Sequence, residues 1–408
     1  MKCEWHRISD YVSSGEIEIR TGPFGTQLRA SDYVASGIPV INVRNIGYGT
    51  INEEKLEYID EQTAMRLSMH LLRTNDIVFG RKGAVDRHAF IVEKYNGWLQ
   101  GSDCIRLRVN TKKLLPQYLS YYFLTKRHKG FMESMCSHGS TMASLNQKIL
   151  EKIEFPYVSV ENQMKIVEVL SAIDRKVMVN RNINANLQQQ AQAIFKSWFV
   201  DFEPFQDGEF VESELGPIPK GWSVGRLADI CTYGKDKVAV SELTPENYFS
   251  TENMLANKGG YTSAASLPNV LQTARCVPGD TLVSNIRPYF KKIVYCMMNA
   301  GCSTDVLCLR PKHSKYNTYL YNLGYSDAFF DYMVAGSKGT KMPRGDKQQI
   351  MSYPVILPPD EVIAQFHEFA DAVLKKIWVA LEESKKLTVL RDGLLQKLMS
   401  GELNLSDI

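Results

Sequence analysis

The sequence predicts an α+β fold in which two α/β domains form a tandem repeat, separated by two long antiparallel helices that pair as a coiled-coil spacer. Three observations predict this fold. The same order of signals occurs twice, offset by roughly 200 residues, as expected for an internal repeat. Each copy carries turn-and-strand signals followed by an aromatic-rich helical pattern. A long segment with apolar residues at alternating spacings of three and four then follows each copy.

Length and composition set broad limits. The 408 residues exceed one typical domain and favour two or three. A hydrophobic fraction of 44% with 23% charged residues is typical of a soluble globular chain. The net charge of +3 is too small to indicate a nucleic-acid partner unless the charge is concentrated on one face. Because there is no secretory signal and no apolar run of about 18 residues, we expect a cytoplasmic protein that does not bind membranes.

The cysteines do not suggest a metal site. The chain has 8 of them, and none forms a Cys-x-x-Cys pair. The tightest group lies among apolar and small residues, with no histidine beside it. We therefore expect Cys296, Cys302 and Cys308 to be buried, reduced thiols in strands.

Each half opens with a Trp, followed by an Arg, an apolar residue and an Asp in the same order. The residues are Trp5, Arg7, Ile8 and Asp10 in the first half and Trp222, Arg226, Leu227 and Asp229 in the second. Further on, each half has two turns that feed strands, at 75–79 and 103–108 in the first half and at 279–283 and 305–310 in the second. Both halves are therefore predicted to contain an antiparallel β core.

Three features follow each core in the same order. They are an aromatic-rich helical pattern, a glycine-serine loop leading into a short helix, and an extended proline-containing piece that ends the globular unit. These features lie at 117–129, 139–142 and 155–158 in the first half and at 316–333, 336–342 and 353–359 in the second.

The segments 161–199 and 360–400 are predicted to be long helices, each with an apolar seam. At nearly forty residues each would be a rod of roughly 55 to 60 Å, longer than a small domain. Each helix could lie on its own globular unit, but this length favours antiparallel pairing of the two. Asn180, Asn184, Ser384 and Arg391 interrupt the seam and would fix its register. The seam residues expected to pack are Ile166, Ile173, Leu187, Ile194, Trp198, Ile363, Phe366, Ile377, Leu387 and Leu394.

The ends of these helices carry phrases similar to those of a known family. Residues 193–204 read AIFKSWFVDFEP, and residues 390–403 read LRDGLLQKLMSGEL. With the Pro-Lys-Gly-Trp opening at 219–222 and the Gly-Pro-Phe-Gly loop at 22–25, they resemble the specificity subunits of Type I restriction-modification enzymes. The resemblance spans nearly the whole chain and rests on the order of the motifs.

The resemblance implies a division of the chain into four parts. Residues 1–158 and 204–357 would be target recognition domains, each reading one half of a split DNA site. Residues 159–203 and 358–408 would be conserved helical regions that hold the two domains apart and dock methyltransferase subunits. The first linker, 155–160, departs from the second because it lacks paired prolines like Pro358 and Pro359.

No motif in the sequence indicates catalysis. An adenine methyltransferase needs an Asn/Asp-Pro-Pro-aromatic motif, and the Pro-Pro of 357–360 stands in the wrong order. The lysines of 336–341 miss the spacing of a phosphate loop. His367 and Glu368 lack the second histidine of a metalloprotease and are expected on a solvated helix face. We therefore expect no cofactor or metal on this chain, with S-adenosylmethionine and ATP bound by partner subunits.

Contact with DNA needs Lys and Arg for phosphates and Arg, Asn, Ser and Thr for base edges. Such residues recur in matching loops, although any one of them could equally be an ordinary surface group. Phe24 could contact a groove or pack on the core as a staple, and we favour the staple. The candidates are Phe24, Thr26, Arg81, Lys82, Arg87, Ser140, Thr141 and Asn146 in the first half and Arg287, Lys291, Lys292, Ser337, Lys338, Lys341 and Arg344 in the second.

The expected partners follow from the repeat and from the resemblance. Double-stranded DNA would be read as an unsymmetrical split site, with its halves somewhat more than one helical turn apart. Two methyltransferase subunits would bind about a pseudo-twofold axis, joined by ATP-dependent restriction or translocase subunits. Alternatives are an assembly scaffold that binds only proteins, or the specificity module of a methyltransferase-only system. An enzyme acting alone is disfavoured because its motifs are missing.

Overall fold

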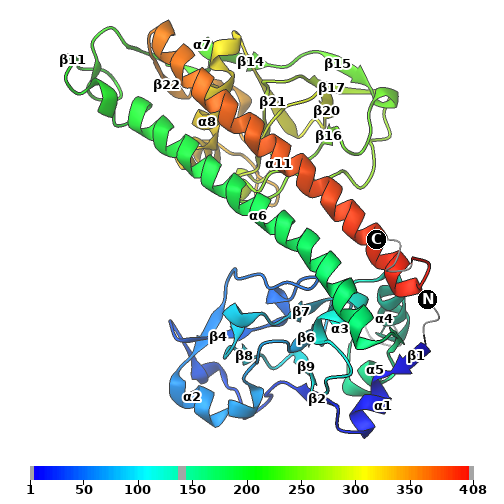
Figure 1. Ribbon diagram of the computed structural model, residues 1–408. Coiled ribbons are helices and arrows are strands. Elements are labelled where there is room, and N and C mark those ends of the chain that lie inside the picture. Colours follow the sequence, from blue (N-terminus) through cyan, green and yellow to red (C-terminus); the bar gives the residue numbers. More distant parts are fainter. Residues whose placement is uncertain (1–3, 137–143, 404–408) are drawn as a thin grey trace. The chain divides into compact units, whose positions relative to one another are not determined.

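The computed structural model describes residues 4–136 and 144–403. The chain divides into two units, of which unit 1 comprises Met1–Val177 with Lys385–Ile408 and unit 2 comprises Met178–Ser384. Two long helices, α6 (Val160–Phe199) and α11 (Asp360–Ser400), each contribute one part to unit 1 and the other part to unit 2 (Figure 1). Their bounds agree closely with the two segments in which the sequence shows an apolar seam.

The globular part of unit 1 is closed by its two ends. Strand β1 (Glu4–Arg7) pairs antiparallel with β10 (Glu154–Tyr157), the last strand before α6. Helix α1 (Ile8–Ser13) begins where the backbone N–H of Arg7 donates to the Asp10 carboxylate at 3.3 Å, and Ile8 is fully buried. The Arg-apolar-x-Asp pattern of the sequence is therefore a helix start that anchors one buried side chain.

The central sheet of unit 1 is antiparallel and has the order β2-β9-β6-β7. Its strands are β2 (Ile17–Thr21), β9 (Cys104–Val109), β6 (Ile77–Gly80) and β7 (His88–Phe90). Alternate residues of β6 face two different cores. Ile77 and Phe79 pack with the helices α3 (Pro116–Tyr122), α4 (Lys126–Cys136) and α5 (Gln147–Glu151), whereas Val78 packs in a second core with Ile41.

A second sheet of unit 1 has the order β3-β5-β4-β8, and its β4–β8 pair is parallel. Its strands are β3 (Tyr33–Val34), β5 (Glu57–Ile59), β4 (Ile38–Ile41) and β8 (Leu99–Gln100). Helix α2 (Glu61–Arg66) follows β5 and begins at Asp60, whose carboxylate accepts the N–H of Thr63 at 2.7 Å.

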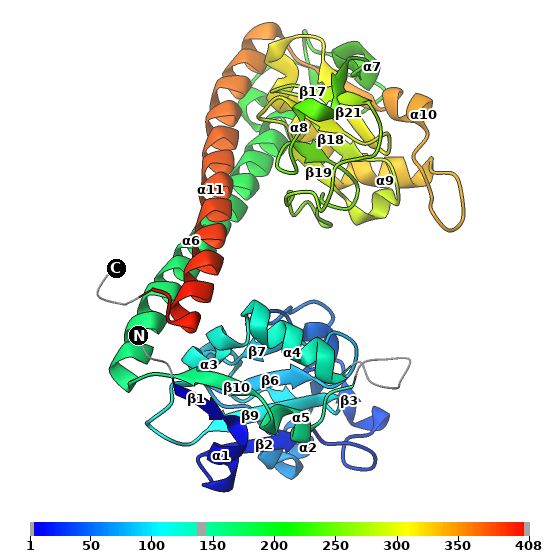
Figure 2. The same ribbon diagram turned by 90° about the vertical axis from the view of Figure 1, so that its right-hand side faces the viewer.

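Unit 2 repeats this plan. Its closing pair is β13–β22, its central sheet has the order β14-β21-β18-β19, and helices α8, α9 and α10 pack beside that sheet (Figure 2). A small hairpin, β11 (Phe210–Val211) with β12 (Ile218–Pro219), precedes it. The repeated elements are β13 (Ser223–Arg226), α7 (Leu227–Ile230), β14 (Cys231–Tyr233), β18 (Thr281–Ser284), β19 (Ile293–Tyr295), β21 (Val306–Pro311), α8 (Asn317–Tyr325), α9 (Asp327–Ala335), α10 (Lys347–Met351) and β22 (Pro354–Leu357).

The second sheet of unit 2 differs from its counterpart. It contains β15 (Lys237–Ala239), β17 (Gln272–Cys276), β20 (Ala300–Cys302) and β16 (Tyr248–Phe249), in that spatial order. Strands β4 and β8 of unit 1 correspond to β16 and β20 of unit 2. In unit 1 the first of the two, β4, pairs with β5, whereas in unit 2 the second, β20, pairs with β17. The last two places of the sheet, one inner and one at the edge, are therefore exchanged between the repeats.

The long helices run antiparallel within each unit and also pack on the globular domain there. In unit 1, Ile166 of α6 shares the domain core with Leu395 of α11. In unit 2, the rings of Phe195 and Phe366 lie 5.8 Å apart in the core. Of the predicted seam residues, Ile166, Ile363 and Phe366 are fully buried. The partly buried ones are Ile173, Leu187, Ile194, Trp198, Ile377, Leu387 and Leu394.

Polar residues in the seam make contacts across the helix pair, as the sequence predicts. In unit 2 the side-chain amide of Asn180 donates to Glu383 at 2.7 Å and to the Ser384 hydroxyl at 3.2 Å. In unit 1 Arg391 forms an ion pair of 2.7 Å with Asp174. Because each contact needs one particular alignment of the helices, these residues fix the register.

The expectation of buried, free thiols is confirmed for the described cysteines, whereas the expected place in a strand is confirmed for Cys302 and Cys308 and is wrong for Cys296. The 7 described cysteines are free and buried. Cys302 lies in β20 and Cys308 in β21, whereas Cys296 directly follows β19. Within the described part of the chain, no helix has the length and apolar character needed to span a membrane.

Candidate nucleic-acid interface

Three loops of unit 1 meet at one edge of the central sheet. The N–H of Gly22, after β2, donates to the carbonyl of Cys104 at 2.9 Å. The N–H of Arg81, after β6, donates to the carbonyl of Asp103 at 2.8 Å, and the Arg81 carbonyl accepts the N–H of Leu145 at 2.8 Å. The predicted loops around Phe24, Arg81 and Asn146 therefore lie side by side, although they come from distant parts of the sequence.

Unit 2 builds the same edge with the same backbone contacts. The N–H of Asn285, after β18, donates to the carbonyl of Asp305 at 2.8 Å. The carbonyl of Asn285 accepts the N–H of Gly345 at 3.2 Å. The N–H of Arg287 donates to the carbonyl of Pro343 at 2.8 Å. The loops 285–292 and 338–346 are thus neighbours, as their counterparts are in unit 1.

In each unit a buried ion pair lies at the other end of the same central strands, away from the loop edge. In unit 1 the Arg108 guanidinium donates two hydrogen bonds of 2.7 Å to Asp76. In unit 2 Arg310 donates to Asp280 at 3.0 and 2.9 Å. Each Asp also accepts a backbone N–H three residues earlier and is 1% exposed. The repeated Asp and Arg therefore join the turn before one strand to the neighbouring strand, and their role is structural.

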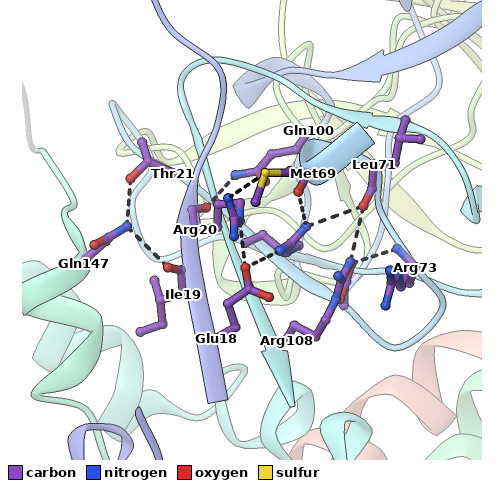
Figure 3. Close-up of polar contacts among 12 residues, drawn as sticks. Glu18, Ile19, Arg20, Thr21, Met69, Leu71, Arg73, Gln100, Arg108 and Gln147 are labelled. Atoms are coloured by element: carbon purple, nitrogen blue, oxygen red, sulfur yellow. Dashed lines mark hydrogen bonds and ion pairs between the residues drawn. The ribbon is translucent and has the colours of Figure 1, made fainter. Parts of the chain in front are cut away.

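Unit 1 has a further charged network between its two sheets. Arg106 is 1% exposed and donates to the carbonyl of Met69 at 3.0 Å and to Glu18 at 2.9 Å. Arg20 donates to the same Glu18 oxygen at 2.7 Å (Figure 3). Burial raises the pKa of Glu18, but the hydrogen bond from Arg20 and the charge of Arg106 outweigh it and lower that pKa overall.

The cations at the edge of unit 1 surround an exposed tyrosine. The Tyr48 ring, 44% exposed, lies 5.5 Å from the Arg87 guanidinium and 4.2 Å from the Lys129 ammonium group. Its hydroxyl donates to Asp86 at 2.7 Å, and burial, followed by this hydrogen bond, raises the pKa of Tyr48. Sequence reasoning missed Tyr48 and Lys129. The signal was an aromatic residue between Gly47 and Gly49.

The other candidates of unit 1 have varied surroundings. Lys82 pairs with Asp103 at 3.3 Å, and Arg81 is half-buried. Thr26 is exposed, and Asn146 caps α5 by accepting the N–H of Ile149 at 3.0 Å. Phe24 is 63% exposed, so the expectation that it packs on the core as a staple is wrong, because the loop turns the ring outward. Ser140 and Thr141 lie outside the described residues.

In unit 2, the later loop is a hairpin-like turn, drawn in orange beyond α9 in Figure 2. The backbones of Lys338 and Arg344 exchange two hydrogen bonds of 2.9 Å. Arg344 pairs with Asp305 at 2.9 Å and Lys338 with Asp346 at 2.7 Å, while Lys341 is exposed. The Ser337 hydroxyl donates to the carbonyl of Val334 at 2.7 Å at the end of α9. The hairpin therefore presents cations on a defined backbone.

The earlier loop of unit 2 directs its cations toward the protein. Lys291 pairs with Asp327 at 2.7 Å. Lys292 donates to the carbonyl of Thr251 at 2.5 Å, and burial lowers its pKa. The Arg287 guanidinium donates to the Lys341 carbonyl at 3.3 Å. Two aromatic residues that sequence reasoning missed, Tyr289 and Phe290, are 48% and 37% exposed. The signal was an aromatic pair flanked by cations in a loop after a buried strand.

Backbone strain is concentrated at this loop. Seven non-glycine residues in the described chain have positive φ, and four of them are Asn257, Lys258, Arg287 and Lys291, with φ between 50° and 60°. This conformation costs a residue other than glycine roughly 1–2 kcal/mol. The N–H groups of Asn257 and Lys258 donate to the carbonyls of Phe290 and Lys291, both at 2.8 Å, so the two strained segments hold each other.

The histidines have structural surroundings. His88 and His128 are fully buried, and burial lowers the pKa of each to about 3. His88 is 2.8 Å from the Ser120 hydroxyl, and the His128 ring is 4.7 Å from that of Phe123. His367, expected on a solvated face, is instead half-buried and 3.2 Å from Thr318, because α8 packs against this side of α11. Among the described residues, no cluster of His, Cys, Asp or Glu could hold a metal ion.

Comparison with known proteins identifies the family. The protein-family model of the Type I restriction modification DNA specificity domain matches residues 22–189 and 219–390, one match for each half of the repeat. The chain belongs to this family. The specificity subunit of the type I restriction enzyme MjaIX from Methanocaldococcus jannaschii is 29% identical over 324 residues, covering 72% of this chain and 71% of that protein. The putative MjaX specificity subunit from the same organism is 22% identical and covers 90% of this chain and 87% of its own length.

A solved structure supports the fold of this family member. The specificity subunit of the Type I restriction-modification system from M. genitalium matches with a TM-score of 0.60 and 16% identity. The match covers 98% of this chain and 96% of that one. Two recognition-type domains with long helices are therefore the shared architecture of the Type I specificity family and this chain.

Proposed function

We propose that this chain is a non-catalytic specificity subunit that reads a split, unsymmetrical site on double-stranded DNA, one half with each globular domain. The observation that carries the proposal is the repeated loop edge. Asp103 and Asp305 accept the same backbone contact in both units, so the loops are held in the same way. The side chains on these loops differ, and a shared scaffold with different loops suits two different half-sites.

Charge at the edge supports contact with a polyanion. Asp103 is paired with Lys82, and its counterpart Asp305 is paired with Arg344. These cations are 57% and 55% exposed, so they can turn to phosphate oxygens without desolvation of a buried group. Lys341 and Arg87 add exposed cations to the two edges.

We further propose that two methyltransferase subunits dock on the helix pair, and that ATP-dependent restriction subunits can join them. The seam repeats after about 200 positions in α6 and α11, which suits two copies of one partner. Val179, Ile183 and Val379 of unit 2 are exposed on these helices, and Val379 repeats the place of Val179. S-adenosylmethionine and ATP would then be bound by those partners, and this chain would supply target choice.

Loop exchange tests the reading function. The loops 285–292 and 338–344 are replaced by those of another family member, and the methylated motif is sequenced in cells. We expect one half of the motif to change and the other half to stay. A change in both halves would contradict independent reading, and an unchanged motif would contradict the assignment of these loops. If the assembled complex does not retain DNA in a sequence-selective, salt-dependent way, the chain is an assembly scaffold instead.

A further inference from the structure

We infer that Tyr289 and Phe290 form an aromatic reading element that contacts the bases of one DNA half-site, while the cations beside them hold the loop in place. The inference rests on the proposed function and adds which residues of unit 2 meet bases rather than phosphates. It concerns the segment 287–292, which the sequence suggests as a patch of cations.

The two rings form a unit that points away from the core. Residues Pro288–Phe290 form a single helical turn, in which Pro288 is buried while Tyr289 and Phe290 are 48% and 37% exposed. The ring centroids are 4.8 Å apart with an interplanar angle of 60°, so the rings support each other edge to face. The pair presents aromatic surface on a loop, where binding residues are often found.

The loop is held rigidly in an unfavourable backbone conformation. Arg287 and Lys291, which flank the turn, both have φ of 50°. The adjoining Asn257 and Lys258 have φ of 55° and 60°, and their N–H groups hydrogen-bond to the carbonyls of Phe290 and Lys291. Strained residues of this kind persist only where their surroundings enforce them, and they gather at binding sites.

The cations of the loop bind groups of the protein itself. Lys291 and Lys258 both bind the Asp327 carboxylate, at 2.7 and 2.9 Å, and the hydrogen bond from Lys291 is the main reason that the pKa of Asp327 is lowered to about 2. Lys292 donates to Thr251, and Arg287 donates to the backbone of Lys341. Releasing these groups to phosphates would undo the contacts that keep the rings exposed.

The neighbouring hairpin supplies the phosphate contacts instead. The N–H of Arg287 donates to the carbonyl of Pro343, so the aromatic turn lies against the hairpin that carries Lys338, Lys341 and Arg344. Rings flanked by exposed cations suit a ligand with apolar surface next to negative charge. The groove of a DNA duplex has this character, with thymine methyl groups and base edges between two rows of phosphates.

The two roles are separated by the salt dependence of binding. The assembled complex, purified with its partner subunits, is titrated with a duplex that carries the motif found by methylome sequencing, at several salt concentrations. The Tyr289→Ala and Phe290→Ala complexes should each bind roughly tenfold more weakly with an unchanged salt slope, because an aromatic contact releases no counterion. Lys341→Gln should reduce the slope by about 0.9 and lower the affinity for all duplexes alike.

Leu271→Ala is the matched control, because this side chain is 91% exposed in the same unit but lies outside the aromatic turn. We expect it to leave both affinity and slope unchanged. Tyr289→Leu keeps an apolar side chain and provides a second variant if Tyr289→Ala lowers the melting temperature. In cells, Tyr289→Ala should relax the motif in the half-site that the loop exchange assigns to unit 2 and leave the other half intact.

Some outcomes overturn the inference and leave the proposed function standing. Unchanged affinity in the folded Tyr289 and Phe290 variants, or a salt slope that falls as in Lys341→Gln, would mean that the rings do not read bases. A relaxed motif in the other half-site would overturn it as well. If the unaltered complex fails to bind the duplex at all, the proposed function itself is wrong.

Discussion

The two globular domains share a scaffold but fill the space between their sheets differently. In unit 1, β2 and β9 place Arg20 opposite Arg106, and both bind Glu18. In unit 2 the same register brings Gly234 opposite Cys308. A Cβ at Gly234 would lie 2.9 Å from the Cys308 sulfur, so the smaller pair leaves no room for a longer side chain.

The surroundings differ along with these residues. In unit 2 the Cys276 thiol is fully buried in one core with Cys302 and Cys308, and these neighbours together with burial raise its pKa. The thiols pack as small apolar groups in the core, where unit 1 has an ion network. The Asp-Arg pair at the far end of the central strands is the same in both units. The backbone contacts that hold the loops and the ion pair that ties the central strands are therefore repeated, whereas the residues that fill the interior vary provided that neighbours change together.

The largest effect is expected where the units agree. Asp76→Ala would leave Arg108, whose side chain is 13% exposed, without its bidentate partner. Asp280→Ala would remove the bidentate partner of Arg310, which keeps an ion pair with Asp236. Each variant should lower the free energy of unfolding of its unit by about 3–5 kcal/mol, as measured by hydrogen exchange resolved along the chain. A loss below about 1 kcal/mol in one unit would break the equivalence of the two scaffolds.

Low pH should destabilise unit 1 through two buried histidines that unit 2 lacks at the corresponding places. Burial lowers the pKa of His88 and His128 from 6.5 to about 3, so the unfolded chain binds more protons than the native one below pH 6.5. Above pH 6.5 both rings are neutral in the native and the unfolded chain and cost no stability. The free energy of unfolding then falls as the pH drops from 6.5 toward 3. At pH 5 the loss should be about 2 kcal/mol for each ring, or roughly 4 kcal/mol for both.

Ile293 and Phe329 occupy the corresponding places in unit 2 and do not titrate. The double variant His88→Ile/His128→Phe should accordingly lose less stability between pH 7.5 and pH 5 than the unaltered chain. Thermal unfolding at the two pH values measures the difference. Equal losses in the two proteins would show that acid acts elsewhere.

A moderate effect is expected where the units differ. Glu18→Ala would leave the buried Arg106 with only backbone acceptors, and we expect a loss of about 2–3 kcal/mol from unit 1. Arg106→Met removes the buried charge instead and should cost about 1 kcal/mol or less. If the order of these two losses in urea unfolding is reversed, the ion network is not what fills the space between the sheets.

The smallest effect concerns the helix starts at the edge. Asn146 caps α5. Asp346 caps α10 because its carboxylate accepts two backbone N–H groups, and it also forms an ion pair with Lys338. Asn146→Ala should cost about 1 kcal/mol, and Asp346→Ala slightly more because it also releases Lys338. Equal losses in thermal unfolding would show that the exposed ion pair contributes nothing.

Much of the fold was predictable because its signals are local. The apolar seams of α6 and α11 and the turns that feed strands β6 and β18 are each encoded in a continuous stretch of sequence, and the structure confirms them. The strand order of the second sheets was not predictable. Strands β4 and β16 are short and lie next to different neighbours, and pairing between distant segments leaves no local pattern.

The sequence by itself determined the repeat, the family and the kinds of residue on each loop. Only the tertiary structure decided which way those residues face. Lys291 and Lys292 read as surface cations, yet a carboxylate and a carbonyl from other segments bind them. The sequence favours a Phe24 ring packed on the core, yet its loop holds the ring outward, as the loops of Tyr48 and Tyr289 also do. The physical reason is that periodicity defines one face of a helix or a strand, whereas the direction of a loop side chain depends on contacts with segments far away in the chain.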